Sequence, residues 1–90
     1  MLMVFAYDVE DNRTRRRVAR VLENHAVRVQ KSVFEAWMDQ DLAREVSRHA
    51  ASELGPNDSL RVYAVGEAGY QRTRVFGTTV LSEKQSYYLI

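Results

Sequence analysis

The stretch MLMVFAYDVEDNRTRRRVARVL, Met1 to Leu22, joins an apolar run to an arginine-rich segment. Its run Leu2–Tyr7 is continuously apolar, too short for a buried helix, and followed by an acidic turn. Such a run predicts a central strand that is covered on both faces. Asp8 ends this strand, and Asp11 or Asn12 can cap a helix that follows. The stretch therefore predicts a strand, a turn and a helix, with a carboxylate at the strand end.

The predicted helix carries five arginines within eight positions, together with an apolar stripe. The stripe recurs at i, i+3 and i+4 and consists of Val18, Val21, Leu22 and Ala26. The opposite face is basic and carries Arg13, Arg16 and Arg20. Arg17 lies at the edge of this face. Arg15 lies near the stripe, but in the first turn, where it can reach back over the strand end.

Length and composition bound the class of protein. Ninety residues make one small domain with a modest core, so oligomerisation would help to stabilise it. No cysteine is present, which excludes disulfides and thiolate metal sites and is compatible with a reduced, cytoplasmic setting. No apolar run approaches the roughly 20 residues that span a bilayer, and the N-terminus lacks a signal-peptide pattern. We therefore expect no membrane association.

The net charge of +1 is unevenly distributed along the chain. Residues 1–31 carry seven basic and four acidic side chains, whereas residues 32–58 carry two basic and six acidic ones. Residues 59–90 are basic again, with four against two. This distribution indicates a local basic face and argues against an indiscriminately basic nucleic-acid binder.

The middle of the chain predicts further strands and a second helix. Residues 27–38 are β-rich and form either one bent strand or two strands split by a turn near Lys31. Asp39 can cap a helix over residues 40–54, whose stripe consists of Leu42, Val46, Ala50 and Leu54, with Ala43 beside it. The sequence Gly-Pro-Asn-Asp at 55–58 ends that helix. Residues 59–65 alternate in polarity, which predicts a strand.

The last quarter predicts a turn at Gly66–Gly69, a charged edge strand at Gln71–Phe76 and a β-prone tail at Ser86–Ile90. We assign residues 1–90 to a single domain, in which 77–90 form a C-terminal loop and strand. The tail can pair with an edge of its own sheet or of a neighbour's sheet, and the small core favours the neighbour. The predicted order is that of an α+β, ferredoxin-like βαββαβ sandwich with an extra C-terminal strand, in a homodimer.

Asp8 is the main candidate for chemistry. A carboxylate at a strand end is a hard oxygen ligand suited to Mg²⁺ or Mn²⁺. Such an ion needs several ligands, and one chain adds at most Glu10 or Asp11. A two-fold dimer could bring two Asp8 side chains together. Alternatively, Asp8 simply starts a turn.

The arginine face is the second candidate. Guanidinium groups match phosphate geometry, and a row of them follows a nucleic-acid backbone without reading bases. No glutamate stands four residues after Arg13 or Arg16, so the helix itself does not neutralise them. The alternative is an ordinary solvated helix face. His25 and His49 lack metal-ligand spacing, no catalytic triad is supported, and nothing indicates a pocket for a small regulatory molecule.

These residues resemble the small CRISPR-associated Cas2 family. The resemblance covers nearly the whole chain and is carried by four motifs: Tyr7-Asp8-Val9, the helix residues Arg15–Ala19, the segment RVQKSVFE at 28–35, and DSLRVY at 58–63. A YD strand end alone is a weak signal. Combined with the basic helix and RVQKSVFE at this spacing, it is specific.

The resemblance implies a ferredoxin-like homodimer whose C-terminal strand crosses to the partner subunit. It implies a role in spacer acquisition, together with an integrase subunit, and Mg²⁺-dependent endonuclease activity on RNA or double-stranded DNA. Asp8 is the implied metal ligand, and the implied active-site positions are Tyr7, Arg15, Arg17, Arg28 and Phe34. The competing hypothesis is a catalytically silent DNA-binding adaptor, in which the binding residues are Arg13, Arg16, Arg17 and Arg20.

Overall fold

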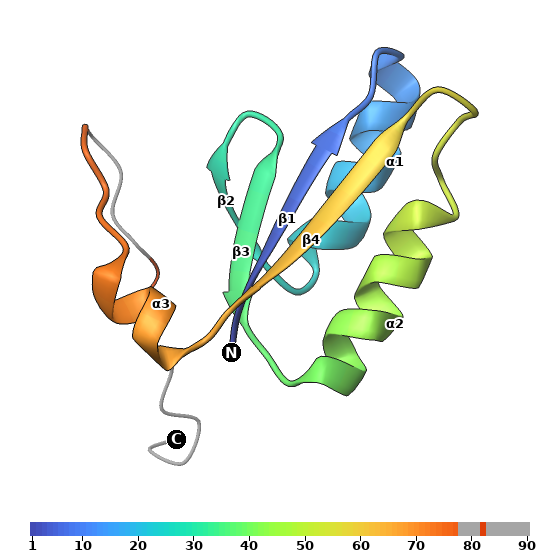
Figure 1. Ribbon diagram of the computed structural model, residues 1–90. Helices are drawn as coiled ribbons and strands as arrows, with labels where there is room; N and C mark the ends of the chain where they lie inside the picture. Colours follow the sequence, from blue (N-terminus) through green and yellow to red (C-terminus); the bar gives the residue numbers. More distant parts are fainter. Residues whose placement is uncertain (78–81, 83–90) are drawn as a thin grey trace.

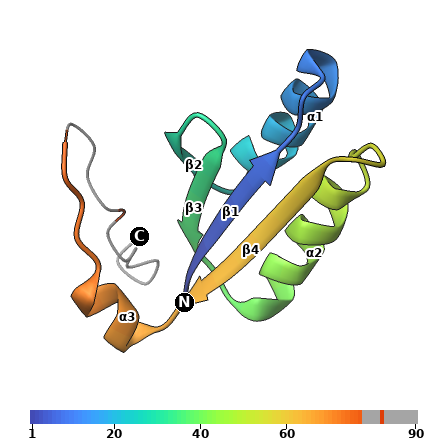
Figure 2. The ribbon, with the colours of Figure 1, turned by 45° about the horizontal axis from the view of Figure 1, so that its top comes forward.

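A computed structural model describes residues 1–77 and Ser82. Its elements are β1 (Leu2–Asp8), α1 (Asn12–Glu23), β2 (Val27–Gln30), β3 (Val33–Trp37), α2 (Gln40–Ala51), β4 (Ser59–Val65) and α3 (Glu67–Arg72). The four strands form one antiparallel sheet in the order β2-β3-β1-β4. Helices α1 and α2 lie side by side across one face of this sheet (Figures 1 and 2). The predicted ferredoxin-like architecture is confirmed.

Strand β1 is one of the two central strands of the sheet, and β3 and β4 pair with its two edges. Side chains alternate along a strand, so successive residues face opposite sides of the sheet. Met3, Phe5 and Tyr7 join the core beneath the helices, and Phe5 is fully buried. Asp8 therefore faces the other side of the sheet, which we call the open face.

Each long helix begins at a carboxylate cap. The Thr14 backbone N–H donates to the Asp11 carboxylate at 2.9 Å, and the Leu42 N–H donates to Asp39 at 2.8 Å. The Thr14 hydrogen bond lowers the pKa of Asp11, since it favours the charged carboxylate. Most members of the predicted apolar stripes are buried, whereas Ala26, Leu42 and Leu54 are partly buried and pack against the core. Helix α2 ends three residues earlier than predicted.

The β-rich segment 27–38 forms two strands, and Lys31 and Ser32 make the turn between them. The Ser32 carbonyl accepts a hydrogen bond from the Tyr7 N–H at 3.0 Å, which fastens this turn to the end of β1. The register shifts between Arg28 and Gln30. The two-strand alternative is therefore correct.

The prediction of a turn at 66–69 and an edge strand at 71–76 is wrong. Residues 67–72 form the helix α3, and residues 73–76 have no regular structure. The Tyr70 ring packs edge-on against Trp37, with centroids 4.8 Å apart, and its hydroxyl donates to the Ser82 carbonyl at 3.1 Å. These contacts with distant residues hold a helical turn despite Gly69, and local sequence cannot reveal them.

The open face is covered at one end only, which corrects the prediction that β1 is covered on both faces. At the Leu2 end, Glu35 is 7% exposed and accepts a hydrogen bond from the Ser82 N–H at 2.8 Å. At the other end, Asp8 and its antiparallel partner Ser59 are exposed. The predicted tail 86–90 and most of the loop 77–85 lie outside the described residues.

Candidate nucleic-acid-processing site

Asp8 occupies the exposed end of the open face. No hydrogen bond or ion pair within residues 1–77 and Ser82 involves its carboxylate. Its diagonal neighbour on β4 is Arg61, which donates to the Tyr63 hydroxyl at 3.2 Å. That hydrogen bond raises the pKa of Arg61. The open face therefore presents a carboxylate with a cationic side chain as its diagonal neighbour.

One chain does not complete a metal site at Asp8. Among the described residues no group of three or more His, Asp or Glu side chains is placed to hold an ion. Asp11 is occupied as the cap of α1. The described part of a single chain therefore offers one free carboxylate here, whereas protein-bound Mg²⁺ usually has one or two carboxylates and keeps several waters.

Most of the other predicted active-site residues gather on the opposite, helix-covered side of the sheet. The rings of Tyr7 and Phe34 stack with centroids 6.2 Å apart, and the Arg28 guanidinium lies over Phe34, 4.8 Å from its centroid. The Arg28 guanidinium also donates to the Lys31 carbonyl and lies 3.6 Å from the Glu23 carboxylate. This cluster and Asp8 therefore do not meet within one chain.

Arg15 connects the cluster to the turn that follows Asp8. Its guanidinium donates to the carbonyls of Val9, at 2.9 Å, and Glu10, at 3.3 Å, and to the side chain of Asn12. The prediction that Arg15 reaches back over the strand end is confirmed. Since the two carbonyls follow Asp8 directly, these bonds fix the direction in which the chain leaves β1.

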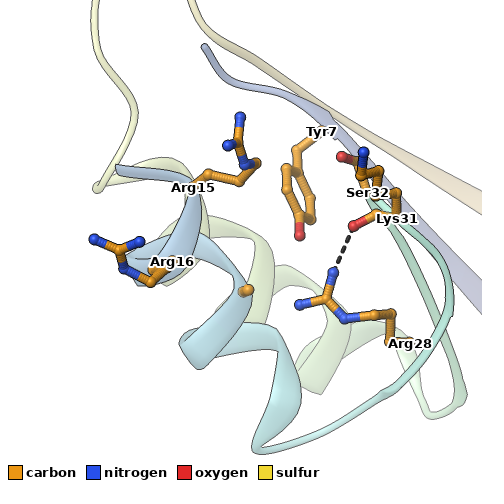
Figure 3. Close-up of a pocket in the computed structure, with 7 residues that line it drawn as sticks. Tyr7, Arg15, Arg16, Arg28, Lys31 and Ser32 are labelled. Atoms are coloured by element: carbon orange, nitrogen blue, oxygen red, sulfur yellow. Dashed lines mark hydrogen bonds between the residues drawn. The ribbon is translucent and has the colours of Figure 1, made fainter. Parts of the chain in front are cut away.

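The cluster borders a pocket of about 280 Å³ between β1, α1 and the β2–β3 turn. Its lining residues are Tyr7, Arg15, Arg16, Ala19, Arg28, Lys31 and Ser32. Figure 3 shows the Tyr7 ring between Arg15 on α1 and the turn that carries Lys31 and Ser32, with Arg28 near its hydroxyl end. We call this the Tyr7 pocket.

Arg17 is not part of this cluster. Its Nε lies 3.0 Å from the Glu53 carboxylate, beyond the end of α2, and its guanidinium also donates to the Thr14 hydroxyl. Arg17 thereby ties α1 to the end of α2. Its position separates it from the other predicted active-site arginines, Arg15 and Arg28.

The remaining predicted nucleic-acid-binding arginines, Arg13, Arg16 and Arg20, are exposed along α1. None of them forms an ion pair with another residue in the described ranges. We call these three residues the arginine row. The row is free to meet an external anion.

Four residues near the two regions were not predicted as site residues: Lys31 and Ser32 in the Tyr7 pocket, and Arg61 and Tyr63 beside Asp8. The sequence signal that could have indicated Lys31 as a site residue is its place in a basic turn between two predicted strands. The alternation predicted for residues 59–65 puts Arg61 and Tyr63 on one face of the strand, as the structure has them. Whether Arg61 and Tyr63 lie on the same face as Asp8 depends on the β1–β4 register, which cannot be predicted from the sequence.

Fold and site together define a small ferredoxin-like α+β protein whose first strand ends in an exposed aspartate beside an arginine-rich helix. Residues 1–73 match the model of the family described as CRISPR associated protein Cas2. The chain belongs to this family, as the resemblance indicated.

Relatives and solved structures agree with this assignment. The chain is similar to the CRISPR-associated endoribonuclease Cas2 3 of Chloroflexus aurantiacus, at 33% identity over 91 residues that span 100% of this chain and 98% of the relative. It is 39% identical over 66 residues to the CRISPR-associated endonuclease Cas2 2 of Thermus thermophilus, covering 71% and 72% of the two chains.

Two crystal structures share the fold. One is the hypothetical protein TT1823 of Thermus thermophilus, with a TM-score of 0.78, 35% identity and coverage of 91% and 96%. The other is Streptococcus pyogenes Cas2, with a TM-score of 0.72, 25% identity and coverage of 86% of this chain and 100% of that one. No helix within the described residues is both long enough and apolar enough to cross a bilayer.

Proposed function

We propose that the protein is a homodimeric, metal-dependent endonuclease that takes part in CRISPR spacer acquisition together with an integrase subunit. Its substrate is RNA or double-stranded DNA. The observation that carries the proposal is Asp8, which is exposed at the end of β1 without a hydrogen-bond or ion-pair partner in the described chain. The names endoribonuclease and endonuclease, carried by relatives at 33% and 39% identity, support the same activity.

The need for a second copy follows from the ligand count. Within residues 1–77 and Ser82, one chain offers one suitably placed carboxylate, and the helices leave the open face around it uncovered. In the proposed dimer the two open faces meet, and Asp8 of each copy contributes to one site for Mg²⁺ or Mn²⁺. When bound, the ion supplies a Lewis acid for the phosphate and an activated water.

The chain's own residues have separate tasks in this proposal. Asp8 binds the ion, and the neighbouring Arg61 attracts the anionic backbone of the substrate. Arg15 is a positioning residue, because its bonds to the Val9 and Glu10 carbonyls hold the turn after Asp8. Tyr7, Arg28 and Phe34 brace the strand end from the helix-covered side of the sheet.

The test is cleavage of single-stranded RNA and of duplex DNA by the purified chain in Mg²⁺, in Mn²⁺ and in EDTA. Asp8→Asn should lower the rate by about a hundredfold or more, the scale of losing one electrostatic group at a reacting centre. Asp11→Asn is the matched control: it removes the same charge three residues away, and asparagine still caps α1.

Size-exclusion chromatography should show an intact dimer for both variants. Manganese binding by the wild type, measured calorimetrically, should disappear in Asp8→Asn and persist in Asp11→Asn. Undiminished cutting by Asp8→Asn, or equal losses in the two variants, would refute the assignment of Asp8. A wild type that cuts neither substrate with either metal would refute the nuclease.

The arginine row favours a second function, that of a DNA-binding structural adaptor for the integrase. Arg13, Arg16 and Arg20 are exposed and unpaired within the described chain, and they follow one side of α1. Replacing two of them, by Arg16→Ala with Arg20→Ala, should weaken duplex binding. The slope of log K against log salt should become shallower by about 1.8, because each phosphate that the protein no longer neutralises accounts for about 0.9.

The matched control for this experiment is Arg44→Ala with Arg48→Ala on α2. Both of these arginines are exposed, and Arg44 lies 3.4 Å from the Asp41 carboxylate, so the control removes the same number of charges from a helix face that carries its own acid. It should leave the salt slope unchanged. Equal effects of the two pairs, or none from the α1 pair, would show that DNA does not lie along the arginine row.

A further inference from the structure

The Tyr7 pocket is lined by four cations and no carboxylate. Arg15 and Arg16 come from α1, Arg28 from β2 and Lys31 from the β2–β3 turn. One acid lies close by, since the Glu23 carboxylate is 3.6 Å from the Arg28 guanidinium. Lys31 and Arg16 form no ion pair with any described residue. The pocket therefore keeps an excess of positive charge.

The Tyr7 hydroxyl is the second and independent observation. The Tyr7 side chain is 5% exposed, and its hydroxyl is buried without a hydrogen-bond partner among the described residues. Buried tyrosine hydroxyl groups normally have a partner, because an unpaired one loses its bonds to water. Tyr7 itself lines the pocket, and Figure 3 shows its hydroxyl on the side where Arg28 lies. A ligand oxygen in the pocket would supply the missing partner.

The cationic side chains are already held in place. Arg15 is fixed by the Val9 and Glu10 carbonyls, and Arg28 is fixed by the Lys31 carbonyl and the face of Phe34. A guanidinium has five N–H donors, so each group retains donors for a ligand. Groups ordered before binding lose less entropy when the ligand arrives.

The shape of the site selects among anions. A volume of about 280 Å³ is much larger than a water molecule and accepts a phosphate group with part of its substituent. The Tyr7 hydroxyl is buried, so a group that ends in the pocket can reach it more easily than one that continues on both sides. An internal phosphodiester continues in two directions, whereas a phosphomonoester ends in three free oxygens.

We propose that the Tyr7 pocket binds a phosphomonoester, with the Tyr7 hydroxyl donating to one phosphate oxygen while the surrounding cations neutralise its charge. The ligand is the terminal phosphate of a nucleic-acid strand or that of a free mononucleotide. The site lies on the side of the sheet opposite Asp8. It goes beyond the proposed nuclease, because it requires neither Asp8, nor a metal, nor cleavage.

The test compares binding of matched ligands to the purified full chain in EDTA at constant ionic strength. The first pair is an eight-nucleotide strand with a 5′-phosphate and the same strand with a 5′-hydroxyl end. A strand with a 3′-phosphate is measured alongside this pair. The other pair is AMP and adenosine. Wild type should bind the phosphorylated member about tenfold more tightly, the effect of one charge-assisted hydrogen bond.

Tyr7→Phe should reduce this preference severalfold, and Lys31→Ala, at an exposed position on the turn, should reduce it without touching the core. Arg44→Ala on α2 is the control and should leave it intact. A preference seen with strands alone identifies a strand end, and one seen with AMP alone identifies a mononucleotide. Equal affinity within both pairs, or a preference that Tyr7→Phe and Lys31→Ala both leave unchanged, would overturn the proposal. The nuclease could fail without affecting either result.

Discussion

Tyr7 and Asp8 are adjacent in the chain, yet they belong to different environments. Tyr7 is buried on the helix-covered side of the sheet, where it lines a pocket together with four cationic side chains. Asp8 is exposed on the open face. Period-two alternation along β1 produces this separation. One strand end therefore presents an anion-attracting pocket on one side and a cation-attracting carboxylate on the other.

The two sides also differ in what they contribute to stability. The helix-covered side contains the core, in which Phe5 and Phe34 are fully buried and paired across β1 and β3. The open face is covered at its Leu2 end by the contacts of α3 and Ser82, and is exposed at the Asp8 end. Substitutions in the core of the first side should change stability strongly, and those at exposed positions of the open face should change it little.

The largest effect is expected from Phe34→Ala. It empties the centre of the core and should lower the free energy of unfolding by about 3–5 kcal/mol, measured by urea denaturation. Its counterpart is Val27→Ala on the open face, where Val27 is 62% exposed. This substitution should lower the free energy of unfolding by about 0.5 kcal/mol or less. Similar costs for the two variants would contradict the difference between the faces.

A smaller effect is expected from Tyr70→Phe, which tests how α3 covers the Leu2 end of the open face. The substitution removes a hydroxyl that donates to the Ser82 carbonyl at 3.1 Å and leaves the ring against Trp37. It should lower stability by about 1 kcal/mol. Thermal unfolding at equal protein concentration measures this, and an unchanged midpoint would show that the hydroxyl bond does not hold the segment.

A still smaller, pH-dependent effect is expected at Asp11. Its pKa is below the ordinary value of 3.8, so the cap stabilises the fold at higher pH and the gain is lost as pH falls through the lowered value. Asp11→Asn keeps a cap that does not titrate. The variant should therefore lose less stability than wild type in that acidic range. Identical pH profiles in urea unfolding would contradict this.

The smallest effect on stability is expected from Tyr7→Phe in phosphate-free buffer. The hydroxyl makes no hydrogen bond within the described chain, so removing it should leave the unfolding midpoint unchanged or slightly raised. Tyr70→Phe is the matched comparison, since there the same atom is removed from a bonded position. A loss at Tyr7 as large as that at Tyr70 would show that a structural water satisfies the Tyr7 hydroxyl.

Local patterns in the sequence were sufficient to predict most of the fold. The apolar run before Asp8, the two capped amphipathic helices and the alternating strand at 59–65 each carry their own period and boundary residues. Helix α3 could not be predicted, because it depends on Tyr70 meeting Trp37, which lies 33 positions earlier in the sequence.

The candidate site was predictable as a set of residues but not as an arrangement. The resemblance grouped Asp8 with Tyr7, Arg15, Arg17, Arg28 and Phe34. The structure places Asp8 on one side of the sheet, and four of the others together on the opposite side. It pairs Arg17 with Glu53 at the end of α2. The faces follow from strand register and helix packing, which involve contacts between segments distant in sequence.

The central claim of the proposed mechanism is that two Asp8 carboxylates from two copies form one catalytic site. It can be tested by mixing wild-type chains with Asp8→Asn chains under denaturing conditions, refolding them together, and measuring Mg²⁺-dependent cleavage against the wild-type fraction. If each site needs both carboxylates, activity should follow the square of that fraction, and an equal mixture should retain about a quarter of the wild-type rate. Activity that falls in direct proportion to the wild-type fraction would show that one Asp8 suffices and would contradict the shared site.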